Sequence, residues 1–288
     1  MRTNSLILIC CCAALLAGCS PRSNFDLDKH IGICGEKRGV VAAKVGLDYL
    51  EVSVNSILCP EESDEVFAQR LARVDSIGLP LYSANGFYPQ DIVLLGPDAQ
   101  MERAIAYGKT AVRRAAEAGM KVLVLGSGRS RFVPEGFERA EAEKQFLELL
   151  CAIAPEAEER GVVVAIEPLS RKETNFINTV REGAEFARRT GSPNIAVIAD
   201  FYHMESAGEG PDAIIYCADK LVHCHIAEAI TRTAPGVEGQ NFVPYFDALK
   251  RIGYQGRISM ECRWGDLETE LTIAFETMKA QIRAAKRL

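Results

Sequence analysis

Short apolar runs rich in β-branched residues alternate with longer stretches of helical period along most of the chain. A continuous apolar run of strand length is typical of a strand that is buried on both faces, as in a parallel sheet. The pattern predicts eight such strands, at residues 31–34, 49–54, 79–84, 122–125, 162–166, 195–199, 221–226 and 258–262.

Amphipathic stretches between these runs predict helices, for example at residues 64–77, 101–118, 138–160, 180–190, 245–252 and 267–286. Several of them are followed by glycine, which closes a helix in the left-handed conformation. Eight β-α units in about 250 residues match a single-domain α/β fold, the (β/α)₈ TIM barrel. A doubly wound open sheet is the alternative, but no GxGxxG motif opens a helix after an early strand.

The N-terminal segment has the character of an export signal. Met1 and Arg2 precede an apolar run at residues 6–17, which is too short to span a membrane as a helix. The run ends in Leu-Ala-Gly-Cys19, which resembles the bacterial lipoprotein signal, in which the cysteine is lipidated. We therefore expect a signal peptide at 1–18, a tether at 19–28 and the barrel at 29–288, giving an exported, membrane-anchored lipoprotein. The alternative is a buried N-terminal helix, which should be amphipathic rather than apolar all round.

Charge and cysteine content narrow the function further. The formal net charge is −6, from 33 Lys and Arg against 39 Asp and Glu, and no long basic run is present. Sequence-independent binding to nucleic acid is therefore not expected. The six cysteines beyond Cys19 are scattered and include no CxxC motif, so we expect buried free thiols rather than a structural zinc site.

Acidic and imidazole side chains end four successive predicted strands. Glu167, Asp200, His225 and Glu261 are each separated from the next by about one β-α unit. In a barrel the C-terminal ends of the strands meet at one face, so these side chains can converge there. Any one acid could instead cap the following helix, but this explanation is weak for all four together. Three carboxylates and one imidazole suit magnesium or a divalent first-row ion, and zinc is less favoured by so many hard oxygens.

Two further histidines lie near this group. Period 2 along the strand at 221–226 places His223 on the same face as His225, which predicts an inner-layer position. His203 follows Asp200 by three residues and is expected to reach the pocket from its rim. The alternative interpretation is that His203 is a surface loop histidine.

Four segments carry a resemblance to a known family. Residues 166–179 (IEPLSRKETNFINT), 200–203 (DFYH), 223–228 (HCHIAE) and 253–261 (GYQGRISME) resemble the site motifs of the D-tagatose and D-psicose 3-epimerases, in the same order. Those enzymes are members of the xylose-isomerase-like barrel superfamily. The resemblance extends from about Lys29 to the end of the chain and is strongest from Val162 onward.

This resemblance implies roles for individual residues. Glu167 and Glu261 match the pair that moves protons, Glu173 and His203 match residues that hold sugar hydroxyls, and Arg232 lies near the family's substrate arginine. It also implies one divalent metal ion, with Mn²⁺ expected and Mg²⁺, Co²⁺ or Zn²⁺ as alternatives. The implied metal ligands are Glu167, Asp200, His225 and Glu261.

The implied chemistry is proton transfer next to a sugar carbonyl. A chelated metal stabilises the enediolate, and two carboxylates on opposite faces of the sugar remove and return the proton, which gives epimerisation. Return of the proton to the neighbouring carbon gives aldose–ketose isomerisation, and loss of a hydroxyl gives dehydration of a sugar or inosose. Residues 167–178 favour the epimerase.

Two other classes remain as alternatives. An endonuclease of the related apurinic-site repair class needs a multi-zinc cluster and a basic face, and the sequence shows neither. A lipid-anchored carbohydrate-binding protein without activity remains open, although all four ligands are retained. The sequence also leaves open a homo-oligomer.

The chain departs from the family pattern at two places. Glu261-Cys262-Arg263 stands where the family commonly has Glu-Pro-Phe, and residues 126–129 (GSGR) replace an expected aromatic wall. Arg129, Arg131 and Arg232 lie in predicted loops at the catalytic end. They could bind a phosphate or carboxylate of the substrate, or be solvated loop charges.

Overall fold

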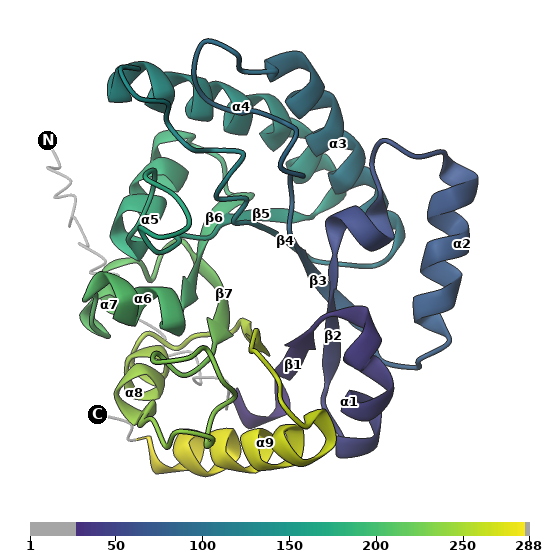
Figure 1. The fold of residues 1–288 in the computed structure, drawn as a ribbon, viewed down its shortest axis with the longest axis vertical. Coiled ribbons are helices and arrows are strands. Elements are labelled where there is room, and N and C mark those ends of the chain that lie inside the picture. Colours follow the sequence, from purple (N-terminus) through teal and green to yellow (C-terminus); the bar gives the residue numbers. More distant parts are fainter. Residues whose placement is uncertain (1–26, 286–288) are drawn as a thin grey trace, which may run out of the picture.

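Eight parallel strands close into a barrel, with β1 to β8 hydrogen-bonded in chain order (Figure 1). The computed structural model describes residues 27–285, and the expected single-domain (β/α)₈ barrel is confirmed. The expected signal peptide and Cys19 lie outside the described residues. The strands are β1 (Ile31–Cys34), β2 (Tyr49–Ser53), β3 (Leu81–Asn85), β4 (Val122–Leu125), β5 (Val163–Ile166), β6 (Ile195–Asp200), β7 (Leu221–Ile226) and β8 (Arg257–Met260).

Helices form an outer ring around this barrel (Figure 1). The short α1, α6 and α7 were not expected from the pattern, because each is brief and α1 contains glycine and several valines, which are weak helix formers. The α-helices are α1 (Gly39–Val45), α2 (Asp64–Asp75), α3 (Met101–Glu117), α4 (Arg139–Arg160), α5 (Val180–Arg189), α6 (Phe201–Ala207), α7 (Asp212–Tyr216), α8 (Val243–Arg251) and α9 (Leu267–Ala284). Two 3₁₀ turns, η1 (Leu27–Lys29) and η2 (Glu36–Arg38), and one π-helical turn, η3 (Val54–Leu58), complete the elements.

Some strand limits differ from the expected ones. β3 begins at Leu81 rather than at residue 79, because Pro80 has no N–H to donate to a ladder and contributes only its carbonyl, to Leu50 N. β6 continues through Asp200, so this acid is the last residue of its strand. β8 stops at Met260, which leaves Glu261 one residue beyond the strand.

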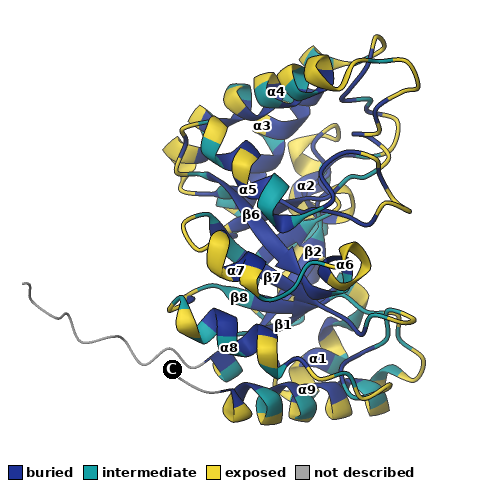
Figure 2. Ribbon diagram, turned by 90° about the vertical axis from the view of Figure 1, so that its left-hand side faces the viewer, coloured by how far each residue is buried: buried dark blue, intermediate teal, exposed yellow. Residues whose placement is uncertain are grey.

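The buried side chains form two clusters. The large one fills the space between the strands and the outer helices, and Figure 2 shows the buried strands inside helices whose outer faces are exposed. The small cluster consists of Val122, Val124, Ala165, Ala196 and Ile198. Ala165 and Ile198 each precede a predicted ligand by two residues, so the alternation of side chains places this cluster inside the barrel, beneath the ligands.

The described cysteines are all free thiols, as expected, but they are not all buried. Cys151 is exposed on α4 and Cys262 is half-buried, which corrects the expectation for these two. Within residues 27–285, no helix has the length and apolar character needed to span a bilayer.

Candidate metal centre and active site

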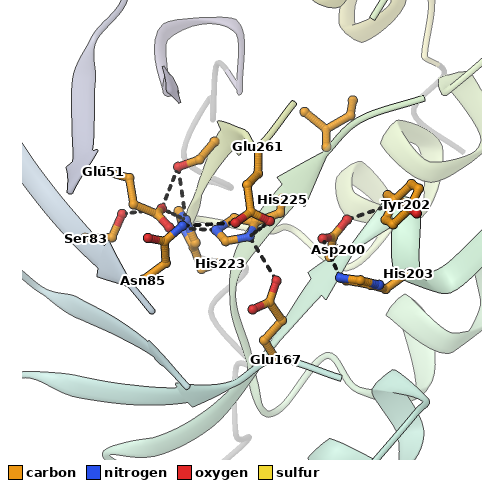
Figure 3. A network of polar contacts seen from close by, with 12 residues as sticks. Glu51, Ser83, Asn85, Glu167, Asp200, Tyr202, His203, His223, His225 and Glu261 are labelled. Carbon is orange, nitrogen blue, oxygen red and sulfur yellow. Dashed lines mark hydrogen bonds and ion pairs between the residues drawn. The ribbon is translucent and has the colours of Figure 1, made fainter. Parts of the chain in front are cut away.

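The four predicted ligands meet at the C-terminal end of the barrel. One ligand atom from each of Glu167, Asp200, His225 and Glu261 lies within 4.8 Å of every other. Glu167 and Glu261 directly follow β5 and β8, Asp200 ends β6, and His225 lies one residue before the end of β7. Figure 3 shows these side chains near one another. All are buried except Glu261, which is half-buried.

The centre of this group is the His225 imidazole. Its Nδ1 lies 3.2 Å from Glu167 Oε1 and 3.5 Å from Glu261 Oε2. Asp200 Oδ1 accepts a hydrogen bond from Tyr202 N at 2.9 Å. Asp200 Oδ2 is buried and makes no hydrogen bond among the described residues, although His203 Nε2 lies 3.5 Å and Arg232 Nη2 3.8 Å from it. A buried carboxylate oxygen without a hydrogen bond is costly unless a cation or donor completes it. The donor set and this oxygen therefore fit a divalent metal ion.

Glu51, on β2, is a functional residue that the sequence analysis missed. It is fully buried, with Oε1 2.8 Å from His225 Nε2 and Oε2 2.8 Å from His223 Nε2. The hydroxyls of Ser83 and Ser259 donate to Oε2 at 2.6 and 2.7 Å. The signal for it was a single acid inside the apolar run Tyr-Leu-Glu-Val, where period 2 points its side chain into the barrel.

Glu51 determines which nitrogen of His225 can bind a metal. A carboxylate only accepts hydrogen bonds, so the Nε2 atom of His225 that faces it carries a proton. Nδ1, on the opposite side of the ring, is then the atom available for the ion. Carboxylates that orient metal-binding histidines in this way also raise the basicity of the ligand. A second group of potential ligand atoms, on Cys34, Glu51 and His225, is less suited to a metal because donors already fill the Glu51 carboxylate.

The buried charges shift the pKa values of these groups in opposite directions. Burial alone would raise the pKa of Glu51, but His225 and His223 outweigh it and hold that pKa well below its usual value. Burial would lower the pKa of His225, yet Glu51 and the other nearby groups raise it well above 6.5. Burial and the charge of Glu261 raise the pKa of Glu167, whereas His225 and Arg232 outweigh burial and lower the pKa of Glu261.

The three expected substrate-binding residues lie beside Asp200. His203 Nε2 is 3.5 Å from Asp200 Oδ2 and 3.8 Å from Glu173 Oε1. Arg232 Nη1 is 3.6 Å from Glu173 Oε1, and its Nη2 pairs closely with Glu261 Oε2. His203 was expected at the rim but is only 2% exposed, because it lies in α6 directly after β6 and its Nδ1 accepts a hydrogen bond from Ser170 N. Its buried Nε2 has no hydrogen-bond partner among the described residues.

The loop that carries Arg232 is organised by one carboxylate. Arg232 has a φ of +62°, and its guanidinium lies over the Tyr202 ring at 4.8 Å. The fully buried Glu228 accepts hydrogen bonds from four backbone N–H groups of this loop. These donors are Gly236, Glu238, Gly239 and Gln240.

Arg131 and Gly126 lie against Glu167. Arg131 is fully buried, so it is not a solvated loop charge, and its Nη2 donates to Glu167 O at 2.7 Å. Burial lowers the pKa of Arg131 to about 10. A Cβ at Gly126 would lie 2.3 Å from Glu167 Oε2, so a side chain at position 126 would displace this carboxylate from its present position.

Comparison with known proteins agrees with the fold. Residues 40–286 match the family model described as Xylose isomerase-like TIM barrel. The chain belongs to this family.

Individual relatives are epimerases. The chain is 27% identical to the D-psicose 3-epimerase of Enterocloster bolteae over 226 residues, which cover 75% of this chain and 73% of the relative. It is 27% identical to the L-ribulose 3-epimerase of a Methylomonas species over 225 residues, covering 76% and 75%. A solved structure of an L-ribulose 3-epimerase superposes with a TM-score of 0.76 at 22% identity, over 89% of this chain and 95% of that one. The chain is an enzyme of the epimerase and isomerase group.

Proposed function

We propose that this protein is a metal-dependent sugar epimerase that inverts a carbon next to the carbonyl of a ketose. The observation that carries the proposal is the placement of two carboxylates, Glu167 and Glu261, on the same imidazole nitrogen, at 3.2 and 3.5 Å. They are the residues directly after β5 and β8, so they approach the centre from different parts of the barrel wall. The similarity to ketose 3-epimerases supports the choice of substrate class.

Glu167, Asp200, His225 and Glu261 would hold the ion. A divalent ion bound there would act as a Lewis acid that withdraws electron density from the sugar's carbonyl and hydroxyl oxygens. Mn²⁺ is the ion we expect, because hard oxygens and one imidazole suit it.

Glu167 and Glu261 would move the proton. One carboxylate removes it from the carbon next to the carbonyl, and the other delivers a proton to the opposite face of the resulting enediolate. Arg232, paired with Glu261 Oε2, would orient this carboxylate. His203 Nε2, which makes no hydrogen bond among the described residues, and the carboxylate of Glu173 would hold the sugar hydroxyls and so fix the position of the substrate.

The test is proton NMR of a panel of ketoses and aldoses in deuterated water with the Mn²⁺-loaded protein. An epimerase incorporates deuterium at the carbon that is inverted, and the epimer accumulates. An aldose–ketose isomerase instead places deuterium at the neighbouring carbon, and a dehydratase releases water. Absence of carbon-bound exchange with every sugar, while the metal stays bound, would contradict an enzymatic role and favour the non-catalytic binding protein.

We also propose that the enzyme is exported and anchored through Cys19. The support is the Leu-Ala-Gly-Cys box directly after the apolar run. Cys19→Ala should release the protein from the membrane fraction or leave the precursor uncleaved, and Cys151→Ala, at an exposed thiol on α4, is the matched control. Unchanged processing and membrane association of Cys19→Ala would refute the anchor.

A further inference from the structure

A cavity of about 320 Å³ adjoins the metal centre on the side of β1, β3 and β8. Its lining includes Glu261, one of the predicted ligands, and Asn85, which donates from Nδ2 to Glu261 Oε1 at 3.1 Å. The cavity is therefore continuous with the proposed active site. Its volume is at the lower end of the range for small-molecule pockets, about 300 to 1,000 Å³, so it can hold one end of a substrate.

The lining of this cavity includes three arginines but only one carboxylate. Arg38 follows β1, Arg232 follows β7 and Arg263 follows β8, and Glu261 is the acid. Arg232 is the only one of the three with a carboxylate within 4.0 Å among the described residues. Arg38 and Arg263 thus line the cavity without a carboxylate counter-ion from residues 27–285, in a protein whose formal net charge is −6.

The backbone holds Arg38 against the cavity. Arg38 Nη1 donates to Cys34 O, at the end of β1, at 2.7 Å. Gly35 between them has a φ of +98°, and a Cβ there would lie 2.3 Å from Arg38 Nη1. A side chain at position 35 would displace the guanidinium, so the glycine allows it to fold back over the strand end.

Arg263 is tied to the loop that carries Arg232. Its backbone N donates to Arg232 O at 2.7 Å, which joins the segments after β7 and β8. The Arg263 side chain itself is exposed, so its charge is available to a ligand.

We propose that this cavity is an anion subsite, and that the natural substrate is a sugar carrying a carboxylate or phosphate away from its reacting carbon. This inference rests on the proposed epimerase function and names its substrate class. Guanidinium groups bind both anions through paired, charge-assisted hydrogen bonds. Arg38 and Arg263 bind the anion, while Arg232 remains paired with Glu261.

The test compares a neutral ketohexose with its 6-phosphate and with the corresponding 6-carboxylate, using the Mn²⁺-loaded full-length protein. We expect kcat/KM to be at least about tenfold higher for one of the anionic sugars, which is about 1.4 kcal/mol of transition-state binding. The sugar with the higher value identifies phosphate or carboxylate as the recognised group. Arg263→Gln and Arg38→Gln should each reduce this preference by about tenfold, and Arg263→Lys should restore part of it.

Arg73→Gln is the matched control, because it removes the same charge from the exposed face of α2. It should leave the preference unchanged. Equal or higher kcat/KM for the neutral sugar would overturn the subsite while leaving the epimerase intact. A preference that survives both arginine substitutions would overturn it as well.

A binding measurement separates this inference from the proposed function. Calorimetric titration with inorganic phosphate and with acetate needs no turnover, and we expect weaker binding of the recognised anion to Arg263→Gln than to the wild-type protein. Anion binding with this dependence, but no carbon exchange for any sugar, would contradict the epimerase alone. Identical titrations of the two proteins would contradict the subsite.

Discussion

Two buried acidic sites share the imidazole of His225, and they differ in how completely their oxygens are satisfied. On the Nε2 side, Glu51 has both oxygens paired with imidazole nitrogens, and two serine hydroxyls add further hydrogen bonds. On the Nδ1 side, Glu167, Asp200 and Glu261 crowd together. Arg232 and Asn85 pair with Glu261 there, but Asp200 Oδ2 makes no hydrogen bond among the described residues.

The difference distinguishes a supporting carboxylate from a metal-binding one. A buried anion that is surrounded by donors is stable without a ligand, whereas like charges within a few ångströms repel one another until a cation joins them. Carboxylates stand on both sides of the ring, so residue type does not separate the two sites. The number of hydrogen-bond donors around the carboxylates therefore indicates which side of the imidazole binds the ion.

The largest effect is expected from removing the shared imidazole. His225→Ala leaves three carboxylates without their nitrogen ligand and leaves Glu51 without one of its donors. We expect loss of bound metal after dialysis, measured by elemental analysis, together with loss of activity. Metal content and affinity equal to those of the wild type would show that the proposed centre is wrong.

The next effect concerns the two carboxylates on the Nδ1 side. Glu167→Gln and Glu261→Gln should each lower turnover by about two orders of magnitude or more, because each removes a positioned base. Rates must be compared at saturating metal, since each side chain is also a predicted ligand. Glu159→Gln, on the exposed surface of α4, is the control and should retain wild-type turnover.

Deuterium exchange sharpens this prediction. If each carboxylate serves one face of the sugar, a variant that lacks one base can still exchange the carbon-bound hydrogen while failing to invert the centre. Wild-type turnover in either variant with metal bound would rule out the two-base mechanism.

A smaller effect on metal binding is expected from substituting Glu51, on the Nε2 side of the imidazole. Glu51→Gln keeps the shape of the side chain but removes the charge that fixes the proton on His225 Nε2. We expect metal affinity to fall by about 10- to 100-fold, as for other groups that orient a metal-binding histidine. Titration with Mn²⁺ measures this, and an affinity within twofold of wild type would mean that Glu51 does not position the imidazole.

The smallest effect is expected from a single donor to Glu51. Ser259→Ala removes one hydrogen bond to Glu51 and one contact with the Tyr49 hydroxyl, both buried. Denaturant unfolding should show a loss of about 1 to 3 kcal/mol in the free energy of unfolding, because the remaining groups lose a buried partner. Metal affinity should change less than in Glu51→Gln, and a larger change would mean that the hydroxyl itself matters for the ion.

The fold could be predicted because its signal is repeated. Apolar runs separated by amphipathic stretches specify the same local unit eight times, and the closed barrel satisfies all of them. Short elements were missed where local preference is weak, as in α1, or where the backbone departs from regular period, as in η3. The limits of β3 and β8 depend on a proline and on the pairing of neighbouring strands, which the pattern of one strand does not contain.

The site could be predicted only in part, because some of its contacts join segments that are far apart in the sequence. The four predicted ligands are polar residues at the ends of apolar strands, so they stand out in the sequence. Glu51 lies within a strand, and its partners Ser83 and Ser259 come from strands far along the chain. The cavity with Arg38 and Arg263 likewise depends on loops that meet only after the barrel has closed.

The single carboxylate that holds the loop after β7 has a consequence for the motions of the active site. Four amide protons of this loop depend on Glu228, so they should exchange with solvent as one cooperative unit rather than independently. Arg232 belongs to the same segment, and its N donates to Glu228 O at 3.0 Å. Each opening of this unit would carry the guanidinium away from Glu261, so the frequency of opening sets an upper limit on how long the assembled site persists.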